Sequence, residues 1–384
     1  MKTKFTIKQV PETRFGSGTL ASLPEEILTI GAQNILLVLD KQMVEQKLTT
    51  SIETILNANR IPYEPFIIVD KILSFEGIQS AVQTVDLTRF DLIIGFGGWR
   101  CTDLAKVFSA HSANPNTIEA IYPGGQTLHA HGIPVISIPT TPPNGAEIDT
   151  KVLVRHTQNK ILLPFEHPLI APRLTIVDPE LMLTLPPDLT AATGIDALTH
   201  AIEALISMEA SPFSEILALQ SIALINENLL DCYRNGSNLR ARYNVALGSL
   251  LAALALNMTG SGAVHALAYP LTARYGIPHP QASALISLGV IRYNVPVVPS
   301  QFVRVARLLG CPVQGIESEA IKAVEALEQL YRAIEHPLHL SSYNIAGIDL
   351  EEFVKLAMQY HELLNRNPRV LEADDILSIY RQIY

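Results

Sequence analysis

The chain has 384 residues, of which 48% are hydrophobic and 17% charged, a balance typical of a folded protein of about two domains and not of a disordered chain. Its formal net charge of −9 disfavours a strongly basic surface, so neither nucleic acid nor a membrane is expected as its main partner. The three cysteines are far apart and the first residues lack the apolar core of a signal peptide, which together indicate a cytoplasmic protein.

Short, continuously apolar runs alternate with helical patterns up to about residue 185. Apolar strands of this kind, separated by helices, are typical of a parallel sheet covered on both faces. The sequence therefore predicts an α/β domain over residues 1–185 with a doubly wound, Rossmann-like parallel sheet. The expected strands are residues 34–39, 63–69, 92–95 and 135–139.

Beyond a proline-rich boundary near residues 179–187, the pattern changes to long helical periodicity rich in alanine and leucine. An all-α domain is therefore expected over residues 186–384. The apolar stretch 245–258 has the length of a buried core helix and is too short to span a bilayer. The expected helices are residues 191–207, 214–233, 239–256, 301–309, 317–334 and 350–365.

Two turns that follow expected strands are candidates for binding a dinucleotide. Gly97 and Gly98 precede a helix expected to open near residue 102, where bare backbone and aligned amides favour a pyrophosphate. Thr140 and Thr141 follow the fourth expected strand, and their hydroxyls could bond phosphate or ribose. Each turn also has a purely structural interpretation, because glycines allow positive φ and a Thr-Pro-Pro segment is stiff.

The residue at the end of the first expected strand bears on the choice of cofactor. Asp40 occupies this place. A carboxylate there can accept both hydroxyls of an adenosine ribose and repel a 2′-phosphate. The sequence therefore favours NAD over NADP.

Four residues of the second half form a candidate metal site. Asp196 and His200 lie four residues apart on an expected helix, so both side chains project from one face. His265 and His279 lie further along the same half. One carboxylate and three imidazoles suit Fe²⁺ or Zn²⁺. Spacing alone leaves open an ordinary ion pair within the helix, although an unpaired charge on so apolar a helix would be costly.

These motifs occur in an order that resembles the iron-containing (group III) alcohol dehydrogenases over nearly the whole chain. The resemblance is carried by the segments RFGSGTLASLPEEI, VDPELMLTLPPDLTAATGIDALTHAIEALIS and VHALAYPLTARYGIPH. It implies hydride transfer between a nicotinamide cofactor and a small alcohol, aldehyde or ketone, and a homodimer. It further implies that Asp196, His200, His265 and His279 hold one divalent metal and that Lys160 contacts a cofactor ribose.

Some departures from the family pattern concern the site. Trp99 and Arg100 replace small residues in the phosphate turn, ahead of the family's aspartate at Asp103. Arg100 would place a charged donor on the pyrophosphate. Tyr269 stands where a histidine is often found four residues after the third ligand, and it is expected to relay the substrate proton.

Two alternative functions stay open at this point. A dehydroquinate-synthase-like lyase shares the architecture, NAD and the metal, but the ligand motifs offer no cluster of basic residues for a phosphorylated substrate beyond Arg274. A degenerate metal-binding protein would have lost its cofactor because Trp99 crowds the phosphate turn. The complete ligand set argues against such a loss.

Overall fold

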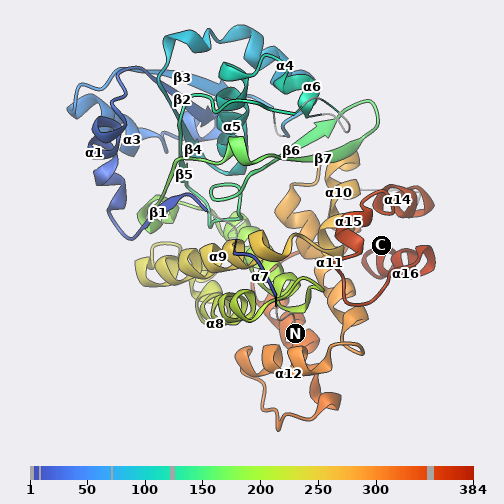
Figure 1. Cartoon of the computed structure of the whole chain (residues 1–384). Coiled ribbons are helices and arrows are strands. Elements are labelled where there is room, and N and C mark those ends of the chain that lie inside the picture. The colour runs from blue at the N-terminus through green and yellow to red at the C-terminus, as the bar shows by residue number, and fades with distance from the viewer. Residues whose placement is uncertain (1–3, 8–9, 71, 122–124, 126, 344–349) are drawn as a thin grey trace. The chain divides into compact units, whose positions relative to one another are not determined.

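In the computed structural model the chain divides into two compact units (Figure 1). The structure describes residues 4–7, 10–70, 72–121, 125, 127–343 and 350–384. The first unit is Gln9–Thr184, and the second is Leu185–Tyr384 together with the described part of Met1–Lys8. The assignment of the cofactor to the first unit and the metal to the second stays a prediction.

The described residues of the first unit form a six-stranded sheet in the order β1-β8-β5-β4-β2-β3, and all of its strand pairs are parallel. An antiparallel hairpin, β6 and β7, lies outside this sheet. The strands are β1 (Glu12–Phe15), β2 (Ile35–Asp40), β3 (Tyr63–Ile68), β4 (Leu92–Gly97), β5 (Val135–Pro139), β6 (Lys151–His156), β7 (Ile161–Glu166) and β8 (Leu174–Val177).

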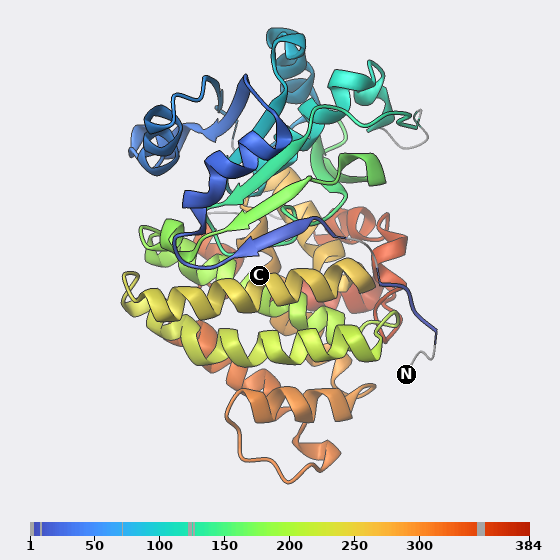
Figure 2. The ribbon, with the colours of Figure 1, turned by 60° about the vertical axis from the view of Figure 1, so that its left-hand side comes forward.

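Helices cover both faces of this sheet (Figure 2). Leu37 and Ile94 pack with residues of α1 and α3 on one face, whereas Leu36 and Ile93 pack with residues of α4 and α5 on the other. The predicted doubly wound sheet is therefore confirmed. The helices of this unit are α1 (Leu23–Ile30), α2 (Lys41–Glu45), α3 (Thr50–Ala58), α4 (Phe75–Thr84), α5 (Trp99–Ala113) and α6 (Thr117–Ala120), with 3₁₀ turns at Thr19–Ser22, Leu87–Arg89, Pro168–Ile170 and Pro179–Met182.

The second unit is helical, as predicted, and α7 is its central helix. Of the 20 residues of α7, 16 are buried, because α8, α9 and α11 pack around it. The helices are α7 (Pro187–Ile206), α8 (Pro212–Arg234), α9 (Leu239–Thr259), α10 (Ala263–Tyr275), α11 (His279–Asn294), α12 (Pro299–Leu308), α13 (Lys322–Ala333), α14 (Leu350–Ala357), α15 (His361–Leu364) and α16 (Ala373–Ile383), with 3₁₀ turns at Glu317–Glu319 and Leu340–Tyr343.

The structure corrects several predicted element bounds. The helix after β4 begins at Trp99 and not near residue 102, because Gly98 already serves as its N-cap. The expected helix 350–365 is wrong, since α14 ends at Ala357 and a separate short helix follows. Residues 317–319 form a 3₁₀ turn ahead of α13, so the helix expected over 317–334 starts later.

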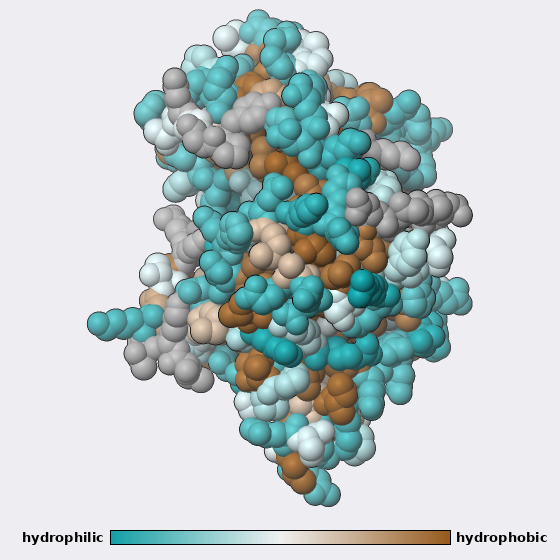
Figure 3. Space-filling view, turned by 90° about the vertical axis from the view of Figure 1, so that its right-hand side faces the viewer, coloured by the Kyte–Doolittle hydropathy of each residue, from teal (hydrophilic) through white to brown (hydrophobic). Residues whose placement is uncertain are grey.

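The length and composition of the described helices bear on membrane crossing. No single helix among them is both long and apolar enough to cross a bilayer. The pair α9 and α10 would meet the length and composition together, with a bend of 104° between them. Hydrophilic residues cover most of the face drawn in Figure 3, with apolar residues between them.

Candidate functional site

Helix α7 carries the buried carboxylate of Asp196. Asp196 is 1% exposed, and neither of its carboxylate oxygens has a hydrogen-bond partner among the described residues. His200 lies one turn further along α7, with its Nε2 3.5 Å from Oδ1 of Asp196. A buried carboxylate without donors is costly unless a cation lies beside it.

Helices α10 and α11 bring two more imidazoles to the same place. His265 lies in the first turn of α10, and its Nε2 is 3.1 Å from Nε2 of His200. His279 opens α11, and candidate ligand atoms of Asp196, His265 and His279 lie within 4.8 Å of one another. Bonds of about 2.0–2.1 Å at tetrahedral angles would separate two ligand nitrogens by about 3.3 Å. The observed spacing therefore fits one shared ion.

The protonation states of these groups also suit a metal. Burial lowers the pKa of His200 and of His279 to about 3, so both imidazoles are neutral at physiological pH. Burial raises the pKa of Asp196, which shows that its charged form lacks solvation where it lies. A divalent ion is bound by neutral imidazole and ionised carboxylate, and would supply the missing positive charge. The residues present fit Fe²⁺ or Zn²⁺.

Glu203 is a site residue that the sequence analysis did not identify. Its Oε2 accepts a hydrogen bond of 2.6 Å from Nδ1 of His265, and its Oε1 accepts one of 2.7 Å from the backbone N–H of Val264. Burial opposes ionisation of Glu203, but the neighbouring His265 outweighs it, and the pKa of Glu203 is lowered. The carboxylate thus keeps the proton on Nδ1, so that the lone pair of Nε2 is the one that can bind a metal.

A spacing in the sequence could have indicated Glu203. It follows Asp196 by seven residues on α7 and therefore lies on the same helix face. Its partner His265 belongs to another helix, and no spacing within α7 reveals that contact. A Cβ added to Gly262, at the N-cap of α10, would lie 3.0 Å from Oε1 of Glu203, so this glycine allows the close approach.

Tyr269 lies against the imidazole cluster. It is buried, one turn after His265 on α10. Its ring centroid is 6.1 Å from that of His265 and 5.5 Å from that of His279. The structure thus brings the predicted proton-relay residue to the predicted metal ligands.

In the first unit, the candidate cofactor turns lie at the carboxyl ends of three adjacent strands. Leu39 of β2 pairs with Phe96 of β4, and Gly97 pairs with Pro139 of β5, so Asp40 and the two turns end at the same edge of the sheet. The backbone N–H of Thr140 donates a 3.0 Å hydrogen bond to the carbonyl of Gly97. This edge, at a change of strand order, is where open α/β sheets bind nucleotides.

Gly97 allows the turn after β4. Its φ is +149°, and an added Cβ would lie 2.6 Å from Sγ of Cys101, so no other residue fits without strain. Gly98 caps α5 with its backbone, and Thr141 lies close to it. Trp99 is half-buried and packs against the apolar cluster that includes α4 and α5. Its indole therefore contacts the core of this unit.

Arg100 and Asp40, both predicted to contact the cofactor, are bonded to each other. Nη2 of Arg100 donates to Oδ2 of Asp40 in an ion pair, and Nη1 donates to the carbonyl of Asp70 at 2.6 Å. Oδ1 of Asp40 accepts from the N–H of Gln42 and caps α2. The predicted contact of Arg100 with a pyrophosphate stays a prediction.

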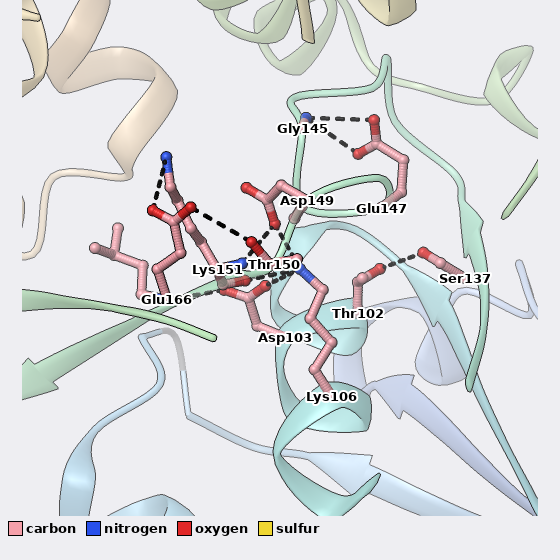
Figure 4. Close-up of polar contacts among 12 residues, drawn as sticks. Thr102, Asp103, Lys106, Ser137, Gly145, Glu147, Asp149, Thr150, Lys151 and Glu166 are labelled. Carbon is pink, nitrogen blue, oxygen red and sulfur yellow. Dashed lines mark hydrogen bonds and ion pairs between the residues drawn. The ribbon is translucent and has the colours of Figure 1, made fainter. Parts of the chain in front are cut away.

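Asp103 belongs to a largely buried polar network that joins α5 to the segment around Asp149 and Lys151 (Figure 4). Its Oδ2 accepts from the N–H of Leu153, and its Oδ1 lies 3.6 Å from Nζ of Lys106. Nζ of Lys106 donates to Asp149 and to the carbonyl of Lys151, each at 2.7 Å. These contacts attach the first two turns of α5 to β6 and to the segment that leads into it.

Lys160 belongs to the hairpin of β6 and β7. It is exposed, in the loop that joins β6 and β7, with a φ of +52°. The hairpin itself was not predicted. The expected contact of Lys160 with a cofactor ribose stays a prediction.

Comparison with known proteins identifies the family. A model described as iron-containing alcohol dehydrogenase matches residues 11–179, and one described as the C-terminal part of the Fe-containing alcohol dehydrogenase family matches residues 190–384. Long-chain-alcohol dehydrogenase 1 of Geobacillus thermodenitrificans (strain NG80-2) is 34% identical over 379 residues, which are 97% of this chain and 95% of the relative.

Other relatives agree with this match. The 1,3-propanediol dehydrogenase of Klebsiella pneumoniae is 31% identical over 374 residues, which are 96% of each chain. A crystal structure of a 1,3-propanediol oxidoreductase has a TM-score of 0.89 at 29% identity and covers 99% of this chain and 100% of its own. Members of the family use NAD(H) and a divalent metal. The chain therefore belongs to the iron-containing alcohol dehydrogenase family and is an oxidoreductase of alcohols and aldehydes.

Proposed function

We propose that the chain interconverts primary aliphatic alcohols and their aldehydes, with one divalent metal held by Asp196, His200, His265 and His279. The observation that carries the proposal is the buried Asp196 carboxylate, which lies beside neutral imidazoles and whose oxygens have no hydrogen bond of normal geometry among the described residues. Support for the substrate class comes from the names of relatives, which act on long-chain alcohols and on 1,3-propanediol.

The metal would act, when bound, as a Lewis acid that favours ionisation of the alcohol and polarises the aldehyde carbonyl. Residues of the chain would orient a metal ligand and move the substrate proton. Glu203 keeps the proton of His265 on Nδ1, so that Nε2, which lies 3.1 Å from Nε2 of His200, carries the lone pair. The phenol of Tyr269, beside His265 and His279, exchanges the substrate proton, directly or through water.

The cofactor would be held by the carboxyl edge of the parallel sheet. The amides that follow Gly97 and Gly98 open α5 and suit a pyrophosphate. Thr140 and Thr141 offer hydroxyls from the adjacent turn, and Lys160 is assigned to a ribose. Asp103 holds the start of α5 in place through Leu153 and Lys106.

We also propose an oligomeric state and a cellular location for the chain. We take the chain to be a homodimer that works in the cytoplasm, where its three free thiols would stay reduced. Light scattering after size exclusion measures the subunit number directly. Neither the lyase nor the degenerate binding protein is favoured, because the matching relatives are alcohol and aldehyde dehydrogenases.

The proposal is tested by oxidation of NADH with short aldehydes, measured on protein stripped of metal and then reloaded with Fe²⁺ or Zn²⁺. Turnover should require the metal, and His265→Ala should abolish it and weaken metal binding at least about 100-fold, because a ligand is lost. The matched control is His339→Ala, an exposed histidine of the same unit. Full turnover by His265→Ala, or metal-independent turnover, would contradict the proposed site.

A further inference from the structure

The ion pair between Arg100 and Asp40 changes the charge at the place where an adenosine ribose is expected. Asp40 ends β2, next to the strand that carries the glycine turn. A lone carboxylate at this position binds ribose hydroxyls and repels a 2′-phosphate. Here the carboxylate has a guanidinium bonded to it, so its negative charge is balanced.

Both oxygens of Asp40 already have donors. Oδ1 accepts from the N–H of Gln42 at 2.9 Å, and Oδ2 accepts from Arg100. The carboxylate is therefore held in one orientation by α2 and by the guanidinium. It has less capacity left to accept two ribose hydroxyls than a free carboxylate would have.

Arg100 reaches away from the phosphate turn. In the sheet, β5 and its threonine turn lie on one side of β4, whereas β2 and β3 lie on the other. Arg100 starts in the first turn of α5, after β4, and bonds to Asp40 at the end of β2 and to the carbonyl of Asp70 just beyond β3. Its guanidinium thus lies at the end of β2, where the adenosine ribose is expected.

The guanidinium can still bind a ligand there. Its two bonds to the protein use two of five N–H donors. The side chain of Arg100 is 24% exposed, and that of Asp40 13%. A planar guanidinium with donors to spare is well suited to a phosphate group.

We propose that Arg100 lets this site take a 2′-phosphorylated dinucleotide, NADP(H), as well as NAD(H). The guanidinium balances Asp40 and donates to the 2′-phosphate, so Arg100 determines cofactor specificity. This inference rests on the proposed function, because it assumes that the adenosine ribose lies at Asp40.

Direct titration of the metal-loaded protein with NADH and with NADPH tests the inference. The wild-type chain should bind NADPH with a Kd within about tenfold of that for NADH. Arg100→Gln should raise the ratio of the NADPH Kd to the NADH Kd by about 10- to 100-fold, the usual effect of a charged hydrogen bond. Asp40→Asn should lower the same ratio, and it carries the test if Arg100→Gln does not fold.

A control variant and two adenosine nucleotides test whether the effect is specific to Arg100 and to the 2′-phosphate. Arg89→Gln removes an arginine of the same unit that is paired with Glu64, and it should leave the ratio as it is. Adenosine 2′,5′-bisphosphate should bind more tightly than adenosine 5′-monophosphate to the wild type and lose this advantage in Arg100→Gln. Equal weakening of both dinucleotides by Arg100→Gln, or binding of NADH without NADPH by the wild type, would overturn the inference alone. Failure of both dinucleotides to bind the wild type would instead overturn the proposed function.

Discussion

The side chains of the candidate metal site come from three helices, α7, α10 and α11. Asp196 and His200 could be paired from the sequence, because four residues separate them on one helix. His265 and His279 were candidates by residue type and by their place in the same half, and the family resemblance strengthened their assignment, since spacing alone does not show that α10 and α11 approach α7. Glu203 escaped notice for the same reason, because its hydrogen bond to His265 joins residues 62 positions apart.

Replacement of Glu203 by glutamine tests its positioning role. We expect Glu203→Gln to weaken Zn²⁺ binding about 10- to 100-fold, because the carboxylate no longer fixes the proton on Nδ1 of His265. Isothermal titration of the metal-free protein measures the change. Glu227→Gln, an exposed glutamate on α8, is the matched control. Unchanged zinc affinity in a folded Glu203→Gln protein would show that Glu203 has no influence on the ligand.

Secondary-structure elements were predictable where the apolar pattern was long. The strands β2 to β5 and the helices α7 to α9 follow continuous apolar runs or long helical periods, and their existence is confirmed. The strands β1 and β8 have four residues each, too few for a pattern, and β1 contains two charged residues. The hairpin β6–β7 was missed because Pro164 and several polar residues interrupt its alternation.

Helix α5 depends on a buried network whose charge should change with pH. Burial raises the pKa of Asp103 to about 7, although Lys106 opposes the shift. Burial likewise raises the pKa of Glu147 to about 7. Because these folded-state values exceed the unfolded ones, the folded chain holds protons that the unfolded chain has lost. The resulting stabilisation is greatest below about pH 4 and is lost as the pH rises through 7.

Asp103→Asn should therefore reduce the pH dependence of stability. The wild-type free energy of unfolding should fall between pH 5 and pH 8, with Asp103 contributing on the order of 2 kcal/mol, and part of this slope should vanish in the variant. Urea titration followed by the fluorescence of Trp99, the single tryptophan, reports on this unit. Glu45→Gln, at an exposed site, should retain the wild-type slope. An unaltered slope in Asp103→Asn would contradict the role given to its proton.

At the scale of the whole molecule, the change of pattern along the chain predicted an α/β half and a helical half, and the structure confirms both folds. Apolar patterns report on burial and therefore reveal such halves well. They carry little information on specific polar contacts, which depend on side chains from distant segments. The bond between Arg100 and Asp40 is such a contact, and each residue had been assigned separately to the cofactor.

The central claim is that one metal is held by residues of the second unit and the nicotinamide nucleotide by residues of the first. A crystal structure of the chain grown with Zn²⁺ and NADH, with the ion located by anomalous scattering, tests both parts at once. The account predicts an ion about 2.0–2.2 Å from an oxygen of Asp196 and from one nitrogen each of His200, His265 and His279. It also predicts the pyrophosphate at the turn of Gly97 and Gly98. An ion bound elsewhere, with the Asp196 carboxylate still lacking a partner, would contradict the account.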